Sequence, residues 1–323
     1  MILNATNFCN YLNNNYVFEN KPHVAIAISG GPDSMALLNL VNIWVKTKKG
    51  IVEALIVNHN IRKNSKDEAH KVRNILTKNK IKSKILNTNI KNVKKKNMNE
   101  ARDNRYLLLT KYCKNKKILH LFVAHHFDDN LETFLFRRVS GSNFEGLESM
   151  NKKVVNNKIN ILRPLLNVSK KQIYKFNKIN KLEYIEDPTN INLKFTRPII
   201  RKYLSEISLK KKKDIVNDFK FMKKNIPKYK NMISEILFKN LDYVGSKTIK
   251  IDQNKLLKYD DFIVERIIQR IYSFLSNKPA YIRFSKIVIL IKFIKTNNLK
   301  IFNLKDMKIE KIENLLFFSL KKG

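Results

Sequence analysis

Between residues 23 and 140, short apolar runs alternate with longer amphipathic stretches. The apolar runs have strand length and are predicted as four strands, over His23–Ser29, Val52–His59, Ser83–Leu86 and Leu119–His125. The intervening stretches repeat apolar residues at helical spacing and are predicted as helices, over Ser34–Lys48, Ser65–Lys78, Met98–Lys114 and Asn130–Val139. Strands and helices that alternate in this way form right-handed βαβ units, so the pattern predicts an α/β fold with a Rossmann-like parallel sheet.

The pattern changes after about residue 145, where we expect a helical extension of the same domain. Helices are predicted over Ser169–Asn180 and Leu193–Ile207, with Pro198 at a helix start or a kink. The charge run Lys210–Lys213 follows, and we place a domain boundary there. The predicted domains are therefore residues 1–209 and 210–323.

The second domain combines two helical patterns with two short alternating runs. Helices are predicted over Phe262–Leu275 and Phe284–Lys295, and the alternating runs cover Leu299–Leu304 and Met307–Leu316. This mixture predicts a smaller α+β domain, in which we identify no catalytic constellation.

The chain is strongly basic, with 65 Lys and Arg residues against 27 Asp and Glu residues and a formal net charge of +38. Such an excess makes nucleic acid or another polyanion the first expected partner. Lys, Asn and Ile are also abundant at unremarkable positions, so a general compositional bias explains part of the charge. Charge alone therefore indicates polyanion binding and no particular activity.

The two cysteines, Cys9 and Cys113, are far apart and form no CxxC pair. This spacing argues against a disulfide framework, a zinc site or an iron–sulfur cluster. The N-terminus lacks the pattern of a signal peptide, and no apolar run reaches the length that spans a membrane. We therefore expect a soluble cytoplasmic protein.

The first predicted strand is followed by the loop Ser29-Gly30-Gly31-Pro32-Asp33-Ser34, in a chain with only seven glycines. Paired glycines between a strand and a helix let a phosphate approach the main chain, and the helix N-terminus offers free N–H donors. No lysine follows the glycines, so the loop would rely on amides and hydroxyls, with Asp33 holding a metal or the loop backbone. A tight turn with an Asp or Ser helix cap is the alternative.

This loop resembles the PP-loop of the N-type ATP pyrophosphatases, which cleave ATP between its α and β phosphates. Further segments between residues 20 and 205 resemble, in order, those of the tRNA(Ile)-lysidine synthetase family of that superfamily. They are VNHNIR at 57–62, EARDNRY at 100–106, AHHFDDNLET at 124–133, RPLL at 163–166, and EDPTN at 186–190 with Arg197 and Arg201. Six ordered motifs are more specific than one glycine-rich loop.

The resemblance implies modification of an isoleucine tRNA whose anticodon is CAU. ATP, with Mg²⁺, adenylates C2 of the wobble cytidine, and the amino group of free L-lysine then displaces AMP to give lysidine. This reaction switches decoding from AUG to AUA and aminoacylation from methionine to isoleucine. A homodimer would fit, and the C-terminal domain would contact the tRNA body.

The resemblance also assigns roles to individual residues. Asp33 would hold metal or phosphate, and Asp129 and Glu132, three apart on one helix, would hold lysine. Arg197 would pair with the carboxylate of lysine. Residues His125 and Arg105 would contact the target cytidine, and we expect Asp129 to accept a proton during the attack of the amine.

Each of these residues also has a structural interpretation. Asp128 and Asp129 open a helix and would serve as N-terminal caps, while Glu132 would form an ion pair with Arg102 or Arg105. His59 alone would be a structural histidine. The placement of the motifs at predicted strand ends, where ligands bind in such folds, favours the functional interpretation.

Three positions depart from the family pattern. Asn58 stands where the family has Asp, Asn60 stands where it has Gly, and Pro198 stands where Asn follows the arginine. Asn58 removes a negative charge that would orient metal or nucleotide. Asn tolerates a left-handed backbone better than most residues, so we expect the loop at Asn60 to keep its shape.

Other classes of function are weaker matches. A tRNA thiolase would need catalytic cysteines or a cluster, and an amidating synthetase would lack the AHHFDDNLET segment and so basic a chain. A nucleic-acid-binding protein that has lost catalysis would not need the intact carboxylates Asp33, Asp129 and Glu132.

Overall fold

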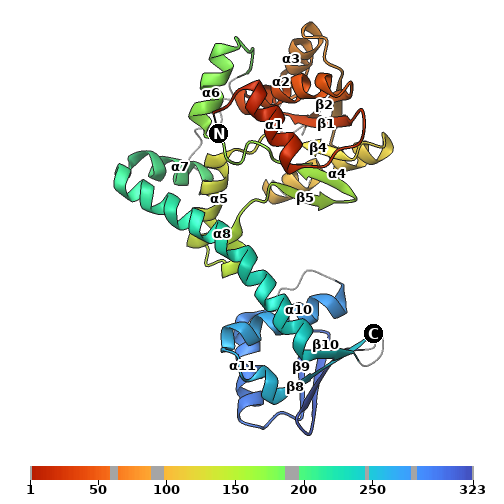
Figure 1. Ribbon diagram of the computed structural model, residues 1–323, viewed down its shortest axis with the longest axis vertical. Coiled ribbons are helices and arrows are strands. Elements are labelled where there is room, and N and C mark those ends of the chain that lie inside the picture. The colour runs from red at the N-terminus through yellow and green to blue at the C-terminus, as the bar shows by residue number, and fades with distance from the viewer. Residues whose placement is uncertain are drawn as a thin grey trace. The chain divides into compact units, whose positions relative to one another are not determined.

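The computed structural model describes residues 2–58, 65–88, 98–185, 196–243, 247–277 and 282–321 (Figure 1). It divides into two compact units, Met1–Met222 and Lys223–Gly323. The division falls inside a continuous helix, α8 (Leu209–Asn240). The expected boundary at residues 209 and 210 lies where this helix begins, because the lysine run forms its first turn. Residues Phe219, Ile226 and Ile233 give the helix a buried apolar face.

The N-terminal unit contains a six-stranded sheet in the order β3-β2-β1-β4-β6-β5. The strands are β1 (His23–Ile28), β2 (Ile51–Asn58), β3 (Ser83–Asn87), β4 (His120–Phe122), β5 (Lys153–Asn156) and β6 (Ile159–Leu162). All neighbours pair in parallel except β5, which pairs antiparallel with β6. The predicted Rossmann-like parallel sheet is confirmed.

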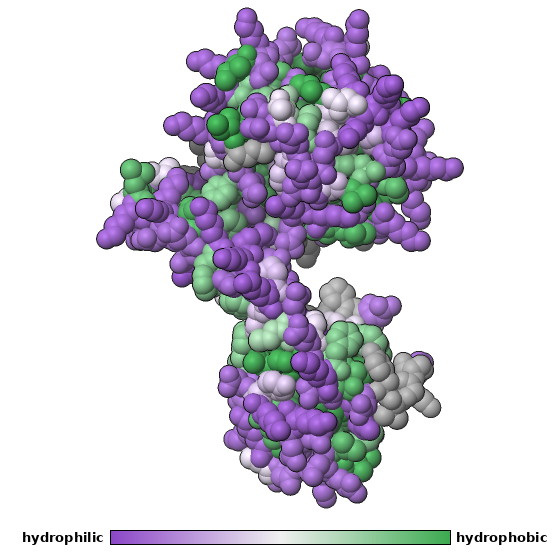
Figure 2. Space-filling view, viewed as in Figure 1, coloured by the Kyte–Doolittle hydropathy of each residue, from purple (hydrophilic) through white to green (hydrophobic). Residues whose placement is uncertain are grey.

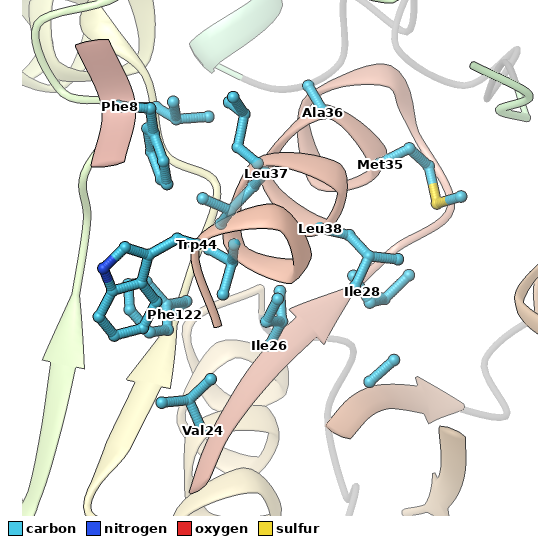
Figure 3. Close-up of a cluster of buried hydrophobic side chains, with 14 of the residues drawn as sticks. Phe8, Val24, Ile26, Ile28, Met35, Ala36, Leu37, Leu38, Trp44 and Phe122 are labelled. Carbon is cyan, nitrogen blue, oxygen red and sulfur yellow. The ribbon is translucent and has the colours of Figure 1, made fainter. Parts of the chain in front are cut away.

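Helices cover both faces of this sheet, because successive residues of its parallel strands enter different apolar clusters. Val24 and Ile26 pack into a cluster with α1 (Ala5–Asn15), α2 (Pro32–Thr47), α3 (Ser65–Lys78) and α6 (Lys170–Ile179). Ala25 packs on the opposite face against α4 (Met98–Asn115). Figure 3 shows Trp44 of α2 beside Phe122 at the end of β4, with ring centroids 6.2 Å apart.

The remaining elements of this unit are α5 (Phe127–Val139), the short 3₁₀ helix η2 (Phe144–Glu148) and α7 (Thr196–Glu206). Pro198 lies in the first turn of α7, where its missing N–H removes no helical hydrogen bond.

The hairpin β5–β6 differs from the expected helical extension after residue 145. Strand β6 pairs with β4 and extends the sheet, while the first three residues of β5 are exposed. An exposed four-residue edge strand has no apolar alternation, so pairing with β6, and not a local pattern, defines β5.

The C-terminal unit contains a five-stranded antiparallel sheet in the order β7-β8-β11-β10-β9. The strands are β7 (Leu241–Tyr243), β8 (Thr248–Asp252), β9 (Ile301–Leu304), β10 (Met307–Ile312) and β11 (Leu315–Leu320). The helices are α9 (Gln253–Leu256), α10 (Asp261–Ser276) and α11 (Phe284–Lys295). The predicted α+β class is confirmed, although the expected run Met307–Leu316 is two strands that turn at Glu313, whose φ is 52°.

The visible surface is predominantly hydrophilic (Figure 2), as the excess of lysine predicts. Among the described residues, no helix combines the length and the apolar character that crossing a membrane requires.

Candidate active site

The glycine-rich loop connects β1 to α2 and is shaped by its own hydroxyl groups. Gly31 caps α2 and Pro32 occupies the first helical turn. The hydroxyl of Ser34 donates to the carbonyl of Gly31 at 3.0 Å and lies 3.2 Å from the hydroxyl of Ser29. The loop therefore encloses the N-terminus of a 16-residue helix, where main-chain N–H groups carry partial positive charge.

Gly30 has a φ of +85°, a backbone conformation that side chains resist. A Cβ atom at this position would lie 2.4 Å from Cγ2 of Val72 in α3. The carbonyl of Gly30 accepts a hydrogen bond from the amide of Ile185, and the side chain of Asn177 donates to the carbonyl of Pro32. The loop is thus fixed by Val72 of α3 on one side, and by Asn177 of α6 and Ile185, which follows α6, on the other.

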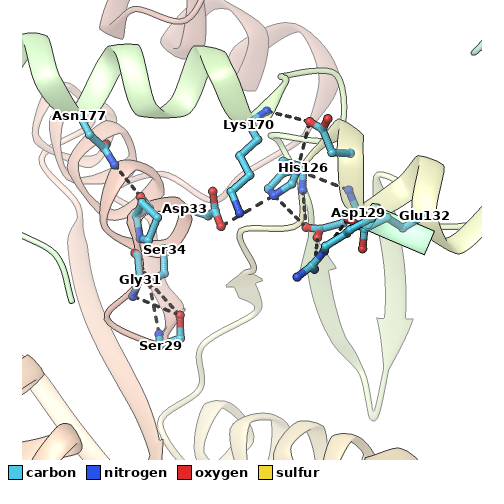
Figure 4. Close-up of polar contacts among 12 residues, drawn as sticks. Ser29, Gly31, Asp33, Ser34, His126, Asp129, Glu132, Lys170 and Asn177 are labelled. Atoms are coloured by element: carbon cyan, nitrogen blue, oxygen red, sulfur yellow. Dashed lines mark hydrogen bonds and ion pairs between the residues drawn. The ribbon is translucent and has the colours of Figure 1, made fainter. Parts of the chain in front are cut away.

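The side chain of Asp33 points from this loop toward the segment that follows β4 (Figure 4). Its Oδ2 lies 3.8 Å from Nε2 of His126. Burial raises the pKa of Asp33 above its ordinary value and Asp129 adds to this effect, against the opposing influence of His126, Lys170 and Arg201. Its Oδ1 is buried without a hydrogen-bond partner among the described residues.

His126 lies between three carboxylates and connects the two halves of the site. Its Nδ1 accepts a hydrogen bond from the amide of Asp129, so Nε2 carries the proton of the neutral ring. Nε2 lies 3.5 Å from Oδ2 of Asp129 and 3.8 Å from Oδ2 of Asp33, while Nδ1 lies 3.6 Å from Oδ2 of Asp128. The imidazole is 2% exposed.

Of the two aspartates after His126, Asp129 has the expected capping role at α5, whereas Asp128 caps a different helix, α6. The carboxylate of Asp129 accepts from the backbone N–H of His126 at 3.1 Å and completes a capping box at the start of α5. The carboxylate of Asp128 accepts from the amide of Lys170 at 2.8 Å and thereby caps α6. These bonds fix the site as well as the helices, because they hold α5 and α6 beside Asp33.

Glu132 lies on the same helix and pairs with an arginine, although neither Arg102 nor Arg105 is the partner. Nε of Arg201, on α7, donates to Oε1 of Glu132 at 2.7 Å, and its NH2 lies 3.9 Å from Oδ1 of Asp129. Burial opposes the charged form of Arg201, but the two carboxylates and Asp33 raise its pKa above the ordinary value.

His125 belongs to a separate basic cluster. Its Nδ1 accepts a hydrogen bond from Nε of Arg163 at 3.3 Å. Burial alone would raise the pKa of Tyr106, but the guanidinium groups of Arg163, Arg105 and Arg102 lower it. The guanidinium of Arg105 lies 5.4 Å from the Tyr106 ring, so Arg105 and His125 are linked through Tyr106 and Arg163.

Some predicted site residues lie outside the described part of the chain. The side chain of Arg197, the segment 186–195 and Asn60 are among them. Asn58 is described: it is 4% exposed, and its side chain donates to Oδ1 of Asn87 at 3.2 Å. An amide at this position therefore bridges β2 and β3.

The residues present fit ATP and Mg²⁺. The buried Oδ1 of Asp33 is available to a cation, and Mg²⁺ in nucleotide sites is held by one or two carboxylates together with the phosphates. Within the described ranges, no group of three or more His, Cys, Asp or Glu residues is arranged to hold a metal by itself. Phosphate oxygens would therefore have to complete the coordination.

The sequence motifs predict the loop and the carboxylates, but they predict no role for His126, Lys170 or Arg201. His126 and Arg201 are in the quoted motifs, so the signal was present. Lys170 lies outside them, and its side chain extends toward Asp33 (Figure 4). Its position depends on the tertiary contact between α6 and Asp128.

The loops after β1 and β4 meet at the point where the strand order reverses, since β1 lies between β2 and β4. Ligands of open α/β sheets bind in this crevice. The fold and the anion-binding loop thus define an α/β nucleotide-binding protein. The chain belongs to the PP-loop domain family, whose model matches residues 4–207.

Two curated relatives are both called tRNA(Ile)-lysidine synthase. The protein from Wolbachia pipientis wMel is 43% identical over 199 residues, which cover 61% of this chain and 46% of the relative. The protein from Orientia tsutsugamushi (strain Boryong) is 35% identical over 246 residues, covering 75% of this chain and 54% of the relative. The chain thus spans about half the length of these relatives.

One similar solved structure is the U34-tRNA thiolase from Methanococcus maripaludis with its [4Fe-4S] cluster. It is 17% identical, has a TM-score of 0.56, and covers 69% of this chain and 78% of the thiolase chain. This likeness supports the fold alone.

Proposed function

We propose that the protein joins free L-lysine to C2 of the wobble cytidine in the CAU anticodon of an isoleucine tRNA. Cytidine O2 attacks the α phosphorus of ATP and pyrophosphate leaves. The amino group of lysine then attacks C2, loses a proton, and AMP departs with the former O2. The product reads AUA in place of AUG and is charged with isoleucine in place of methionine.

The observation that carries this proposal is the position of His126 between Asp33 of the glycine-rich loop and Asp129. Its Nε2 lies 3.8 Å from one carboxylate and 3.5 Å from the other. A group activated at the loop would therefore be next to carboxylates suited to an amine. The names of the relatives add the isoleucine tRNA to this chemistry.

For the first half-reaction, the loop would hold the phosphates of ATP through its main-chain N–H groups and through the hydroxyls of Ser29 and Ser34. Mg²⁺, held by Asp33 and phosphate oxygens, would stabilise the charge that develops as pyrophosphate leaves. Asp33 must be ionised for this role. Because the pKa of Asp33 is raised, we expect the rate of ATP use to fall as the pH is lowered. This fall should begin at a pH above 3.8, the ordinary pKa of the group.

For the second half-reaction, Asp129 and Glu132 would receive the ammonium groups of lysine. Nε of Arg201 already donates to Oε1 of Glu132 at 2.7 Å, so an incoming ammonium would share this carboxylate with the guanidinium or replace it. We assign proton acceptance to Asp129, whose Oδ1 is 3.9 Å from Arg201 and whose Oδ2 is held by the backbone of His126. Arg197 remains the predicted partner of the lysine carboxylate.

His125 and Arg105 would contact the cytidine. Arg163 donates to Nδ1 of His125, which leaves Nε2 as the N–H donor of the neutral ring. That donor is suited to the exocyclic oxygen of cytidine or to a phosphate. A homodimer stays a prediction.

Thiolation is a weaker candidate, because neither cysteine is suited to it. Cys113 is fully buried in α4, and burial together with Glu53 raises its pKa to about 12. Its thiol therefore stays protonated at neutral pH. Burial also raises the pKa of Cys9, which lies in α1.

The test incubates the protein with ATP, Mg²⁺, labelled lysine and an isoleucine tRNA with a CAU anticodon, with methionine tRNA as the control. We expect label only in the isoleucine tRNA and one AMP for each lysine incorporated. AMP formation with another nucleophile would overturn the lysine assignment but keep the loop chemistry. Absence of both label and AMP would favour a protein that only binds nucleic acid.

A further inference from the structure

A shallow groove lies between the second half of α4 and the turn of the hairpin β5–β6, apart from the site described above. Its volume is about 350 Å³. The lining residues come from these two elements alone and are Leu107, Thr110, Lys111, Lys114, Asn157 and Lys158.

Lysines surround the groove. Three of its six lining residues are exposed lysines, and none is acidic. Among the described residues, no ion pair neutralises Lys111, Lys114 or Lys158. Three like charges on neighbouring exposed side chains repel each other, so an anion bound beside them would relieve this repulsion.

Lys158 in the hairpin turn has a backbone conformation that is unfavourable for lysine. Asn157 and Lys158 both have positive φ, at 49° and 66°, as in a two-residue turn that favours Asn followed by Gly. A lysine side chain disfavours this left-handed conformation, which glycine adopts without strain. Lys158 lines the groove opposite α4.

Hydrogen bonds fix the two walls together. The side chain of Asn157 donates to the hydroxyl of Thr110 at 3.3 Å, and this hydroxyl donates to the carbonyl of Tyr106 at 2.8 Å. Thr110 is fully buried. The groove is therefore a built feature and not a chance approach of mobile side chains.

The groove also has an apolar part and a defined relation to the active site. Leu107 is 56% exposed, which gives a ribose or base a surface that a free phosphate ion would not use. The helix α4 carries Arg105 only two residues before Leu107 and nine before Lys114. At about 100° per residue, however, the groove residues of α4 lie on the side of the helix opposite Arg105, and the turn at Asn157 precedes β6, at the edge of the sheet opposite the loops after β1 and β4.

We propose that this groove binds the phosphate–ribose backbone of the RNA whose cytidine enters the active site, at a part of that RNA away from the reacting base. The proposal rests on the proposed function for the identity of the RNA. The lysines would position the backbone without reading sequence, and Leu107 would pack against a sugar or base.

The experiment compares Lys111→Gln/Lys114→Gln/Lys158→Gln with a matched triple variant, Lys46→Gln/Lys71→Gln/Lys78→Gln. The control removes the same charge from exposed positions of α2 and α3, which do not line the groove. Binding of a transcribed isoleucine tRNA is measured from 50 to 300 mM salt, without ATP or lysine. We expect the groove variant to bind roughly 10- to 100-fold more weakly at low salt, with a log–log salt slope reduced by about 2 to 3.

Equal losses in both triple variants would overturn the proposal, because charge alone would explain them. Equal losses of tRNA and tripolyphosphate affinity in the groove variant would assign the groove to a free anion instead of RNA. A second variant, Leu107→Ser, should weaken tRNA binding about threefold and leave tripolyphosphate binding unchanged. Groove-dependent tRNA binding without lysine incorporation would overturn the proposed function and leave the groove assignment standing.

Discussion

The two sheets of this protein bury their strands differently. Strand β1 is parallel to both neighbours and sends residues into apolar clusters on both faces. Strands β8, β10 and β11 alternate between buried and less buried residues, because their antiparallel sheet packs mainly on one face.

This difference explains why the candidate site residues lie in the N-terminal unit. The carboxyl ends of parallel strands lie at one edge, and there the loops after β1 and β4 bring Asp33 next to His126. In an antiparallel sheet neighbouring strands end at opposite edges, so no such convergence follows. The buried polar residues of the C-terminal unit, such as Glu265 and Gln253, are held by contacts within its own core.

The largest expected effect comes from removing the charge of Asp33. Asp33→Asn should lower ATP-dependent AMP formation by roughly 10³-fold, since the loop would lose the carboxylate that we propose holds Mg²⁺. Because the folded state raises the pKa of this carboxyl, its ionised form destabilises the fold, increasingly as pH rises through that pKa. The free energy of unfolding of Asp33→Asn at pH 7 should therefore equal or exceed that of the wild-type protein.

The control is Asp242→Asn, at an exposed position of the antiparallel unit. Comparable losses of activity in both variants would contradict the role assigned to Asp33.

Truncating one core aromatic in each unit should separate stability from function. Phe122 and Phe318 are both fully buried, so Phe122→Ala and Phe318→Ala should each lower the free energy of unfolding by about 3–5 kcal/mol. Only Phe122→Ala should weaken ATP binding, because Phe122 ends β4 directly before the site. Urea unfolding and ATP titration measure the two effects. A similar loss of ATP affinity in the Phe318 variant would contradict this expectation, because Phe318 lies in the antiparallel sheet of the other unit.

The glycine-rich loop can be tested with two glycines of similar φ. Gly30→Ala combines left-handed strain with a clash against Val72, whereas Gly141→Ala has a φ of +66° and no atom within 4 Å. We expect losses of about 2–4 kcal/mol and about 1–2 kcal/mol respectively in urea unfolding. Adding Val72→Ala to the Gly30 variant should restore part of its stability. Equal losses of stability in the two glycine variants would argue against the close contact between the loop at Gly30 and Val72 of α3.

The smallest expected effect concerns two ion pairs of equal length. Arg201→Ala leaves Glu132 buried without its guanidinium and should destabilise the protein by roughly 1–3 kcal/mol, less than for a fully buried pair, since Arg201 is 36% exposed. Arg138→Ala breaks an exposed 2.7 Å pair with Asp218 and should change the free energy of unfolding by about 0–1 kcal/mol. Thermal or urea unfolding checks both, and equal effects would mean that burial does not matter at this site.

The parallel sheet was predictable because strands that are buried on both faces consist of continuous apolar runs. The predicted strand His23–Ser29 is His23–Ile28 in the structure. The hairpin β5–β6 was not predictable from local pattern, since pairing with β4 defines it. Helix α8 was missed because four lysines at its start resemble a linker, while its apolar face comes later.

The site divides in the same way. The loop and Asp129 follow strand ends and were found from sequence. The roles of His126 and Arg201 depend on contacts across elements, from α5 to the loop and from α7 to α5. Such contacts have no signature in the residues of one element.

The most direct test of the account is mass spectrometry of the wobble nucleoside of a CAU isoleucine tRNA after reaction with the protein, ATP, Mg²⁺ and lysine. The account predicts that cytidine is converted to lysidine by the wild-type protein and stays cytidine with Asp33→Asn. Unchanged cytidine with the wild-type protein, while ATP is still converted to AMP, would contradict it.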